Sequence, residues 1–295
     1  MKNWPTMRPR FLSLPRSLAI AASCCLLGAC APQPGESESI RLYALDCGRI
    51  EINLENFTEG NEYDGKKRTV IASAFLIRHP RGDLIWDAGL PDAFSDSNAS
   101  QIEPPAHMSV PVTMASQLAV LDLGPNDIEY FSVSHSHFDH LGNANLLSSA
   151  TFLVDKDERA HMFRQQARTN GRAFPHYSKL EHAKTIEFDG DYDVFGDGSV
   201  TILEMPGHTP GHTPGHTTLQ LKLNNTGPIL LSGDLYHFEE ARLLKTVPKF
   251  NTDVARTLDS MDRFEVIAKS IDARFVIQHS LNHFRELPPF PEYLD

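Results

Sequence analysis

The residues best suited to chemistry lie in one short segment, Ser134-His135-Ser136-His137-Phe138-Asp139-His140. It directly follows an apolar stretch, Tyr130–Val133, that is typical of a β-strand. In an extended backbone the two alternating histidines would project toward one ion, and the aspartate–histidine pair after them could face a second. Imidazole and carboxylate groups are ordinary ligands of zinc and similar divalent metals, so the segment favours a metal site over a solvated polar loop. The predicted ligands are His135, His137, Asp139 and His140.

This His-x-His-x-Asp-His pattern resembles the signature of the metallo-β-lactamase superfamily. In that family the remaining ligands are a histidine after Pro-Gly, an aspartate after an apolar strand, and a histidine near the end of the chain. The sequence has all three in order, as a repeated Pro-Gly-His, Leu230–Asp234 and Val276–His279. The resemblance covers residues 40–295. It implies two divalent metal ions, by default zinc, with Asp234 bridging both and His279 joining Asp139 and His140 at the second.

The Pro-Gly-His motif occurs three times, at residues 206–208, 210–212 and 214–216, and the register of the ligand between the first two copies is open. Counted forward from the preceding strand, the ligand is His208; counted backward from Asp234, it is His212. The shorter gap to Asp234 is the one typical of the family, so His212 is the preferred third ligand of the first metal. His216 is then expected to order the loop.

Further residues have expected roles in turnover. Asp87 matches a family position that supports the metal-binding loop without touching the metal. Two metals sharing a water would generate hydroxide at neutral pH, and Asp139 could pass a proton to the leaving group. Tyr236 or His237, which follow Asp234 directly, could hydrogen-bond the developing oxyanion. The other histidines have no motif around them, so none is expected to act: His79, His107, His161, His176, His182 and His283.

The resemblance is nearest to the N-acyl-homoserine lactonases, the quorum-quenching branch of the family. Three segments carry it: Leu84–Asp92, Gly227–Phe238 and Pro291–Asp295. It implies a hydrolase that opens the ring of a small lactone. The alternatives are a thioesterase of the glyoxalase II type, a phosphotriesterase and, with less support because every ligand position is filled, a non-catalytic metal-binding envelope protein. An apolar groove for an acyl chain could be lined by Phe57, Tyr63, Phe94 and Met114.

The elements that must position these residues alternate between short apolar strands and helical segments. Strands outnumber helices, which predicts an α/β sandwich of two sheets covered by helices. The family resemblance makes this a four-layer αββα arrangement with mixed sheets. The expected strands are 41–45, 50–54, 73–77, 84–86, 130–133, 151–154, 185–188, 200–203, 218–223, 229–232 and 275–278; the expected helices are 112–121, 142–147, 156–168 and 254–270.

The N-terminus has the pattern of an export signal. Residues 1–29 combine basic residues with a short apolar run and no acidic residue. Leu27-Gly28-Ala29-Cys30 resembles a bacterial lipobox, which implies lipidation of Cys30 and a protein of the periplasm or outer membrane. Residues 30–39 would be a flexible tether, and residues 40–295 the hydrolase domain. The net charge of −11 argues against nucleic acid as a partner.

Overall fold

The computed structural model describes residues 39–58, 61–95, 107–208 and 215–295. They belong to one folded unit, residues 37–295. The expected signal peptide, the lipidation site and the tether up to residue 38 lie outside the described residues. Within the described part of the chain, no helix is both long and apolar enough to cross a bilayer.

The first sheet has seven strands among the described residues, in the order β4-β1-β2-β3-β5-β6-β7. Strands β1, β2 and β3 are antiparallel neighbours, whereas β3, β5, β6 and β7 run parallel. Strands β2 and β3 form a hairpin, in which His79 pairs with Gly82 across the turn. The bounds are β1 Arg41–Asn53, β2 Lys67–His79, β3 Gly82–Trp86, β4 Met108–Ser109, β5 Tyr130–Ser132, β6 Thr151–Asp155 and β7 Thr185–Phe188.

The second sheet has five strands in the described residues, in the order β12-β11-β10-β9-β8. Strand β10 is antiparallel to both β9 and β11, and β12 is parallel to β11. Strands β9, β11 and β12 therefore point the same way and end at the same edge. The bounds are β8 Tyr192–Asp193, β9 Val200–Glu204, β10 Thr217–Leu223, β11 Gly227–Leu231 and β12 Arg274–Val276.

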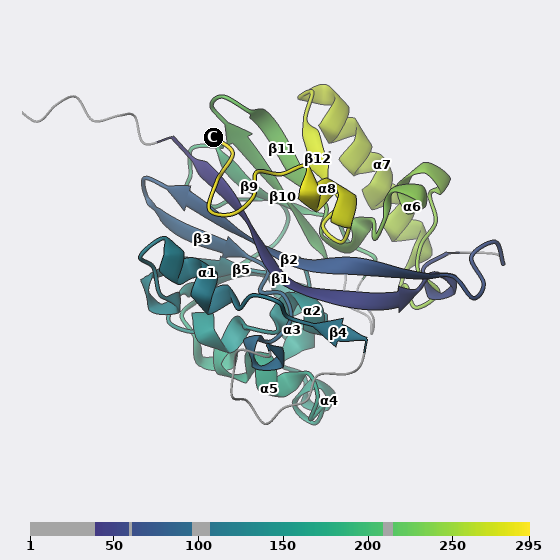
Figure 1. Ribbon diagram of the computed structural model, residues 1–295, viewed down its shortest axis with the longest axis horizontal. Coiled ribbons are helices and arrows are strands. Elements are labelled where there is room, and N and C mark those ends of the chain that lie inside the picture. The colour runs from purple at the N-terminus through teal and green to yellow at the C-terminus, as the bar shows by residue number, and fades with distance from the viewer. Residues whose placement is uncertain (1–38, 59–60, 96–106, 209–214) are drawn as a thin grey trace, which may run out of the picture. The chain divides into compact units, whose positions relative to one another are not determined.

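The two sheets pack face to face, with helices on their outer faces (Figure 1). The core between them contains Phe75 and Trp86 of the first sheet and Ile202 and Leu219 of the second. A second cluster joins the first sheet to α1, α2, α3 and α5, and a third joins the second sheet to α7. The predicted αββα sandwich with two mixed sheets is confirmed. The helices are α1 Met114–Val120, α2 Phe138–Leu141, α3 Lys156–Met162, α4 Gln165–Arg168, α5 Phe174–Tyr177, α6 Glu239–Leu244, α7 Val254–Ser270 and α8 Leu281–Arg285.

Four predicted elements, two strands and two helices, differ from the structure. The two strands expected in 41–54 are one strand, β1, because a register shift between Asp46 and Arg49 absorbs the irregularity against β2. The helix expected over 156–168 is broken into α3 and α4, with Arg164 in an extended conformation between them. The helix expected over 142–147 is a short 3-10 turn, Ala144–Leu147, which follows the unpredicted α2.

Candidate metal centre

Loops at strand ends bring the predicted ligands to one place. His135 and His137 follow β5, and α2 then carries Asp139 and His140. The second sheet contributes from the shared edge of three strands: His208 follows β9, Asp234 follows β11, and His279 follows β12. Ligands far apart in the sequence therefore meet because the strands that precede them end together.

A tight approach of two loops requires glycine at position 233. Gly233 has φ 50°, and a Cβ there would lie 2.8 Å from His216 Nε2 and 2.8 Å from the Ser134 Cβ. A side chain would separate the strand end that carries Asp234 from the loop that carries His135.

The described candidate ligands fall into two groups, and within each group the donor atoms lie within 4.8 Å of one another. The first is His135, His137, His208 and Asp234; the second is Asp139, His140 and His279.

Asp234 faces both groups with different oxygens. Its Oδ2 lies 3.4 Å from His135 Nε2 and 3.3 Å from His208 Nε2. Its Oδ1 lies 3.1 Å from His140 Nε2 and 2.8 Å from His279 Nε2. This is the arrangement of a bridging carboxylate, as predicted for Asp234.

Hydrogen bonds on the far side of each ring determine which nitrogen is free to bind a metal. His279 Nδ1 donates to the Ile71 carbonyl at 2.6 Å, and His140 Nδ1 donates to Asp87 Oδ2 at 2.8 Å. In the neutral form of each ring, the Nε2 atom therefore carries the lone pair, and the two Nε2 atoms face each other at 3.2 Å. Two facing lone pairs repel unless a cation lies between or beside them, so the donor set fits a metal ion.

The first group also contains buried donor atoms that need a partner. Among the described residues, neither ring nitrogen of His208 has a hydrogen bond, nor does Asp234 Oδ1. Unpaired polar atoms at this burial are unfavourable, and a bound cation would satisfy one ring nitrogen of His208 and an oxygen of Asp234.

The electrostatics of the centre agree with cation binding. Burial holds the pKa of His135 and of His208 well below its ordinary value, which leaves the neutral rings that metals bind. Burial acts against charge on Asp234 as well, but the surrounding histidines, first His279 and His140, hold its pKa well below its usual range. The pKa of His140 is raised well above its ordinary value, because Asp87, Asp234 and Asp139 outweigh the effect of its burial. The carboxylates thus attract positive charge, which metal ions would supply in place of protons.

The position expected for His212 is filled by His208 in the described cluster, while His212 itself lies outside the described residues. The main-chain N–H of Met205 donates to the carbonyl of His216 at 2.8 Å, so the chain leaves and rejoins the sheet at these two residues. The first Pro-Gly-His packs against the end of the strand. Its Gly207 has φ 121° and lies so close to Thr257 that a Cβ at this position would clash. We therefore assign His208 to the first group.

His216 has the ordering role expected of it and is not a ligand. Its Nδ1 donates to the Met205 carbonyl at 3.0 Å, and its Nε2 accepts the main-chain N–H of Asp234 at 3.0 Å. Burial lowers its pKa to about 4, consistent with this neutral form.

Buried carboxylates support the histidine loop from behind. Asp87 accepts from the main-chain N–H of Ser134 at 2.7 Å, from its hydroxyl at 2.9 Å, and from His140. This places Asp87 where the sequence predicted it. Glu158 of α3, which the sequence did not single out, accepts from the main-chain N–H of Ser136 at 2.7 Å. Both carboxylates restrict the backbone that carries the ligands.

The two candidate oxyanion donors have different surroundings. The Tyr236 hydroxyl lies in the core against α7, where it donates to Glu265 at 3.0 Å. It therefore does not serve the site, which corrects the prediction for Tyr236. His237 lines the cavity, with its Nε2 3.2 Å from Asp234 Oδ2 and its ring 4.7 Å from that of Phe57. Tyr236 has an extended backbone, so the two neighbouring side chains point to opposite sides, and no local signal in the sequence reveals which of them faces the site.

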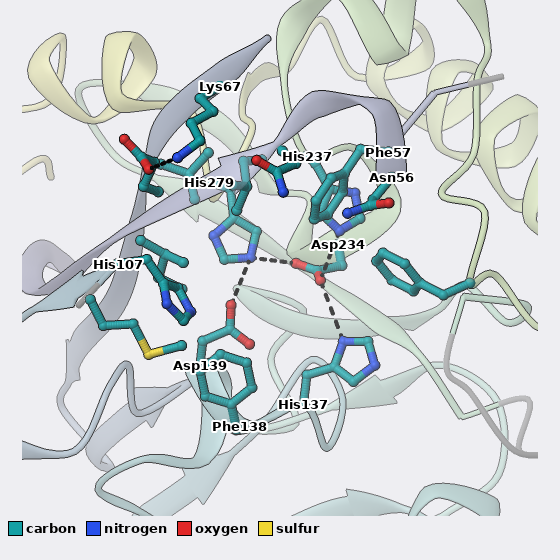
Figure 2. Close-up of a pocket in the computed structure, with 17 residues that line it drawn as sticks. Asn56, Phe57, Lys67, His107, His137, Phe138, Asp139, Asp234, His237 and His279 are labelled. Carbon is teal, nitrogen blue, oxygen red and sulfur yellow. Dashed lines mark hydrogen bonds and ion pairs between the residues drawn. The ribbon is translucent and has the colours of Figure 1, made fainter. Parts of the chain in front are cut away.

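A cavity of about 620 Å³ opens over the centre. Figure 2 shows His137, Asp139, Asp234, His237 and His279 turned toward the same space. Of the four residues expected to line a groove, Phe57 does so, whereas Met114 is buried in the core under α1 and Tyr63 and Phe94 pack against smaller clusters. The sequence also missed His107, which lines the cavity. The apolar lining is Ile50, Ile52, Phe57, Val70, Met108, Phe138 and Phe250.

Comparisons with known proteins point to one family. The family model described as the metallo-beta-lactamase superfamily matches residues 68–266. The N-acyl homoserine lactonase AttM of Rhizobium radiobacter is 29% identical over 275 residues, covering 86% of this chain and 98% of that protein. The N-acyl homoserine lactonase AiiA of Bacillus thuringiensis subsp. kurstaki is 24% identical over 262 residues, with 86% and 98% covered. A solved quorum-quenching N-acyl homoserine lactone hydrolase has the same fold, with a TM-score of 0.71 at 23% identity and coverage of 86% and 98%.

Proposed function

The chain belongs to the metallo-beta-lactamase superfamily, and from this premise we propose that it opens the lactone ring of N-acyl-homoserine lactones. The observation that carries the proposal is the pairing of a two-group metal centre with an apolar cavity directly above it. A small polar ring would lie at the metals and its acyl chain along the apolar wall. Relatives that match nearly along their whole length bear the name N-acyl homoserine lactonase.

Different residues of the chain would have different roles in ring opening. When bound, a pair of divalent cations lowers the pKa of a water and polarises the lactone carbonyl. His135, His137 and His208 would hold one ion, Asp139, His140 and His279 the other, with Asp234 between them. Asp139 lines the cavity beside His279, at 3.6 Å from its Nε2, where it can pass a proton to the ring alkoxide as the C–O bond breaks.

His237 is our candidate for stabilising the negative charge that develops on the carbonyl oxygen. It is the donor-bearing side chain next to Asp234 that faces the cavity. Burial lowers the pKa of His237, so the ring is neutral and keeps one N–H to donate. A single well-placed donor of this kind commonly contributes a few kcal/mol to the reaction barrier.

We propose zinc as the metal. The centre offers five imidazoles and two carboxylates and no thiolate, and imidazole-rich sites of this kind suit zinc.

The lining of the cavity favours a lactone over a glutathione thioester. A glutathione conjugate carries carboxylates that call for cationic partners. In the described part of the chain, Lys67 is the one lysine or arginine lining this cavity, and it already pairs with Glu51 at 2.7 Å. The largely apolar wall fits an acyl chain better.

We further propose that a lipid on Cys30 holds the mature protein at the cell envelope, in the periplasm or on the outer membrane. The support is the Leu27–Cys30 pattern. Fractionation of cells that express the wild-type protein or Cys30→Ser would test this: the wild type is expected with membranes, and an unchanged distribution of the variant would contradict it.

The substrate assignment is tested by proton release from the purified domain, residues 31–295. Lactones with short and long acyl chains, a glutathione thioester and a phosphotriester would be compared with and without chelator. Chelator-sensitive acid production from the lactones is expected. Turnover of only the thioester or the phosphotriester would contradict the proposal and leave the metal centre in place.

A further inference from the structure

Gln278 is a buried polar residue that the reaction described above does not use. It follows β12 and directly precedes the ligand His279, and it is 1% exposed. Its main-chain N–H donates to the Ser232 hydroxyl at 3.3 Å, and its carbonyl accepts from the Ser73 hydroxyl at 2.9 Å. These bonds fix its backbone between the two sheets.

The direction of its side-chain amide is determined by its two neighbours. The indole Nε1–H of Trp86, which can only donate, lies 3.4 Å from Gln278 Oε1. On the other side Nε2 donates to Asp87 Oδ2. Because a carboxylate can only accept and an indole can only donate, the amide has one satisfying orientation.

Asp87 depends on such donors to hold its position. Its backbone has φ 60°, a left-handed conformation that is uncommon for a residue other than glycine. Its side chain is fully buried, and the oxygen that accepts from Gln278 also accepts from Ser134 Oγ and His140 Nδ1.

We propose that Gln278 is a positioning residue for the second metal, acting on His140 through Asp87. The amide holds the carboxylate in the plane where it accepts from the His140 ring, and so keeps His140 Nε2 directed at Asp234 and His279. One dipeptide thereby supplies the ligand His279 and the support for a second ligand. The first group is less directly linked, since Asp87 reaches His135 through Ser134 and reaches Asp234 through His140.

The inference rests on the dinuclear centre of the proposed function and not on its substrate. Zn²⁺ binding is its primary readout, so failure of lactone turnover would leave it standing. Titration of metal-free Gln278→Met with Zn²⁺, in competition with a chromophoric chelator, is expected to show the second ion bound about 10- to 100-fold more weakly than in the wild type. The first ion should change less than about threefold, because fewer links reach it.

The matched control is Gln117→Met, which removes another buried amide, one whose hydrogen bonds go to the main chain of Asp46 and Thr113 and not to a candidate ligand. Gln117 is 5% exposed, and its amide exchanges two 3.0 Å hydrogen bonds with the main chain of Asp46. Thermal denaturation of both metal-free variants measures the stability lost with each amide. Gln117→Met should keep wild-type Zn²⁺ affinity at a comparable loss of stability.

Turnover provides a second readout. In Gln278→Met, kcat should fall at limiting Zn²⁺ and recover with excess Zn²⁺, while KM stays unchanged. Wild-type affinity for both ions, or equal weakening of both, would overturn the proposal. If Gln278→Met does not fold, Gln278→Glu decides, since it keeps the side-chain shape but sets an acceptor against Asp87. Tight binding of the second ion in that variant would also overturn the proposal.

Discussion

Replacing His208 by alanine tests the assignment that the repeated motif left open. His208 is 1% exposed, and its Nε2 lies 3.3 Å from the bridging oxygen of Asp234. The change removes one of the four donors of the first group. Loss of a residue that only supports a ligand typically weakens metal binding by 10- to 100-fold, so loss of a ligand itself should exceed about 100-fold. That factor corresponds to about 2.7 kcal/mol of binding free energy.

The assay is Zn²⁺ titration of the metal-free protein against a chelator, together with elemental analysis of metal per chain. The control is His212→Ala, which removes the same side chain from the second copy of the motif and should change affinity by less than about threefold. The reasoning is refuted if His212→Ala loses an ion while His208→Ala retains two.

Two further predictions concern single side chains. His237→Phe keeps a ring against Phe57 but removes the donor nitrogen, so kcat for a lactone should fall by about 10²- to 10³-fold with metal content unchanged; an unchanged kcat in steady-state kinetics would exclude His237 as the oxyanion donor. Burial, together with Arg164, lowers the pKa of His161 to about 4, so the unfolded chain takes up a proton near pH 6.5 that the folded chain rejects. The contribution of His161 to stability is therefore complete above about pH 6.5 and is lost as the pH falls toward 4. Over that pH range, thermal denaturation of the metal-free protein should show a smaller fall in melting temperature for His161→Leu than for the wild type.

The sequence predicted which side chains come together where each one follows its strand without interruption. Asp234 and His279 directly follow apolar stretches that form β11 and β12, and the histidine cluster follows β5. Because such strands end at a shared edge, residue type and position were enough to place these side chains.

The register of the repeated Pro-Gly-His could not be decided in the same way. The spacing to Asp234 favours His212, whereas the structure places His208, which follows β9, beside Asp234. Spacing counts only the residues between each histidine and Asp234, whereas the position of His208 depends on a hydrogen bond between the ends of two strands.

The wall of the cavity could not be predicted from local pattern either. Ile50 of β1 pairs with Val70 of β2 and with Met108 of β4, so three distant segments form one apolar surface. Each residue has the character of an ordinary strand residue, and only the pairing of the strands brings it over the metals.

The central claim is that two metal ions held by these residues open a lactone. The most direct test is to measure hydrolysis of N-hexanoyl-homoserine lactone by the metal-free domain as Zn²⁺ is added in known ratio to the chain. We expect negligible turnover without metal and a rate that reaches its plateau at two ions per chain. Full activity without metal, or no lactone hydrolysis with two ions bound, would contradict the account.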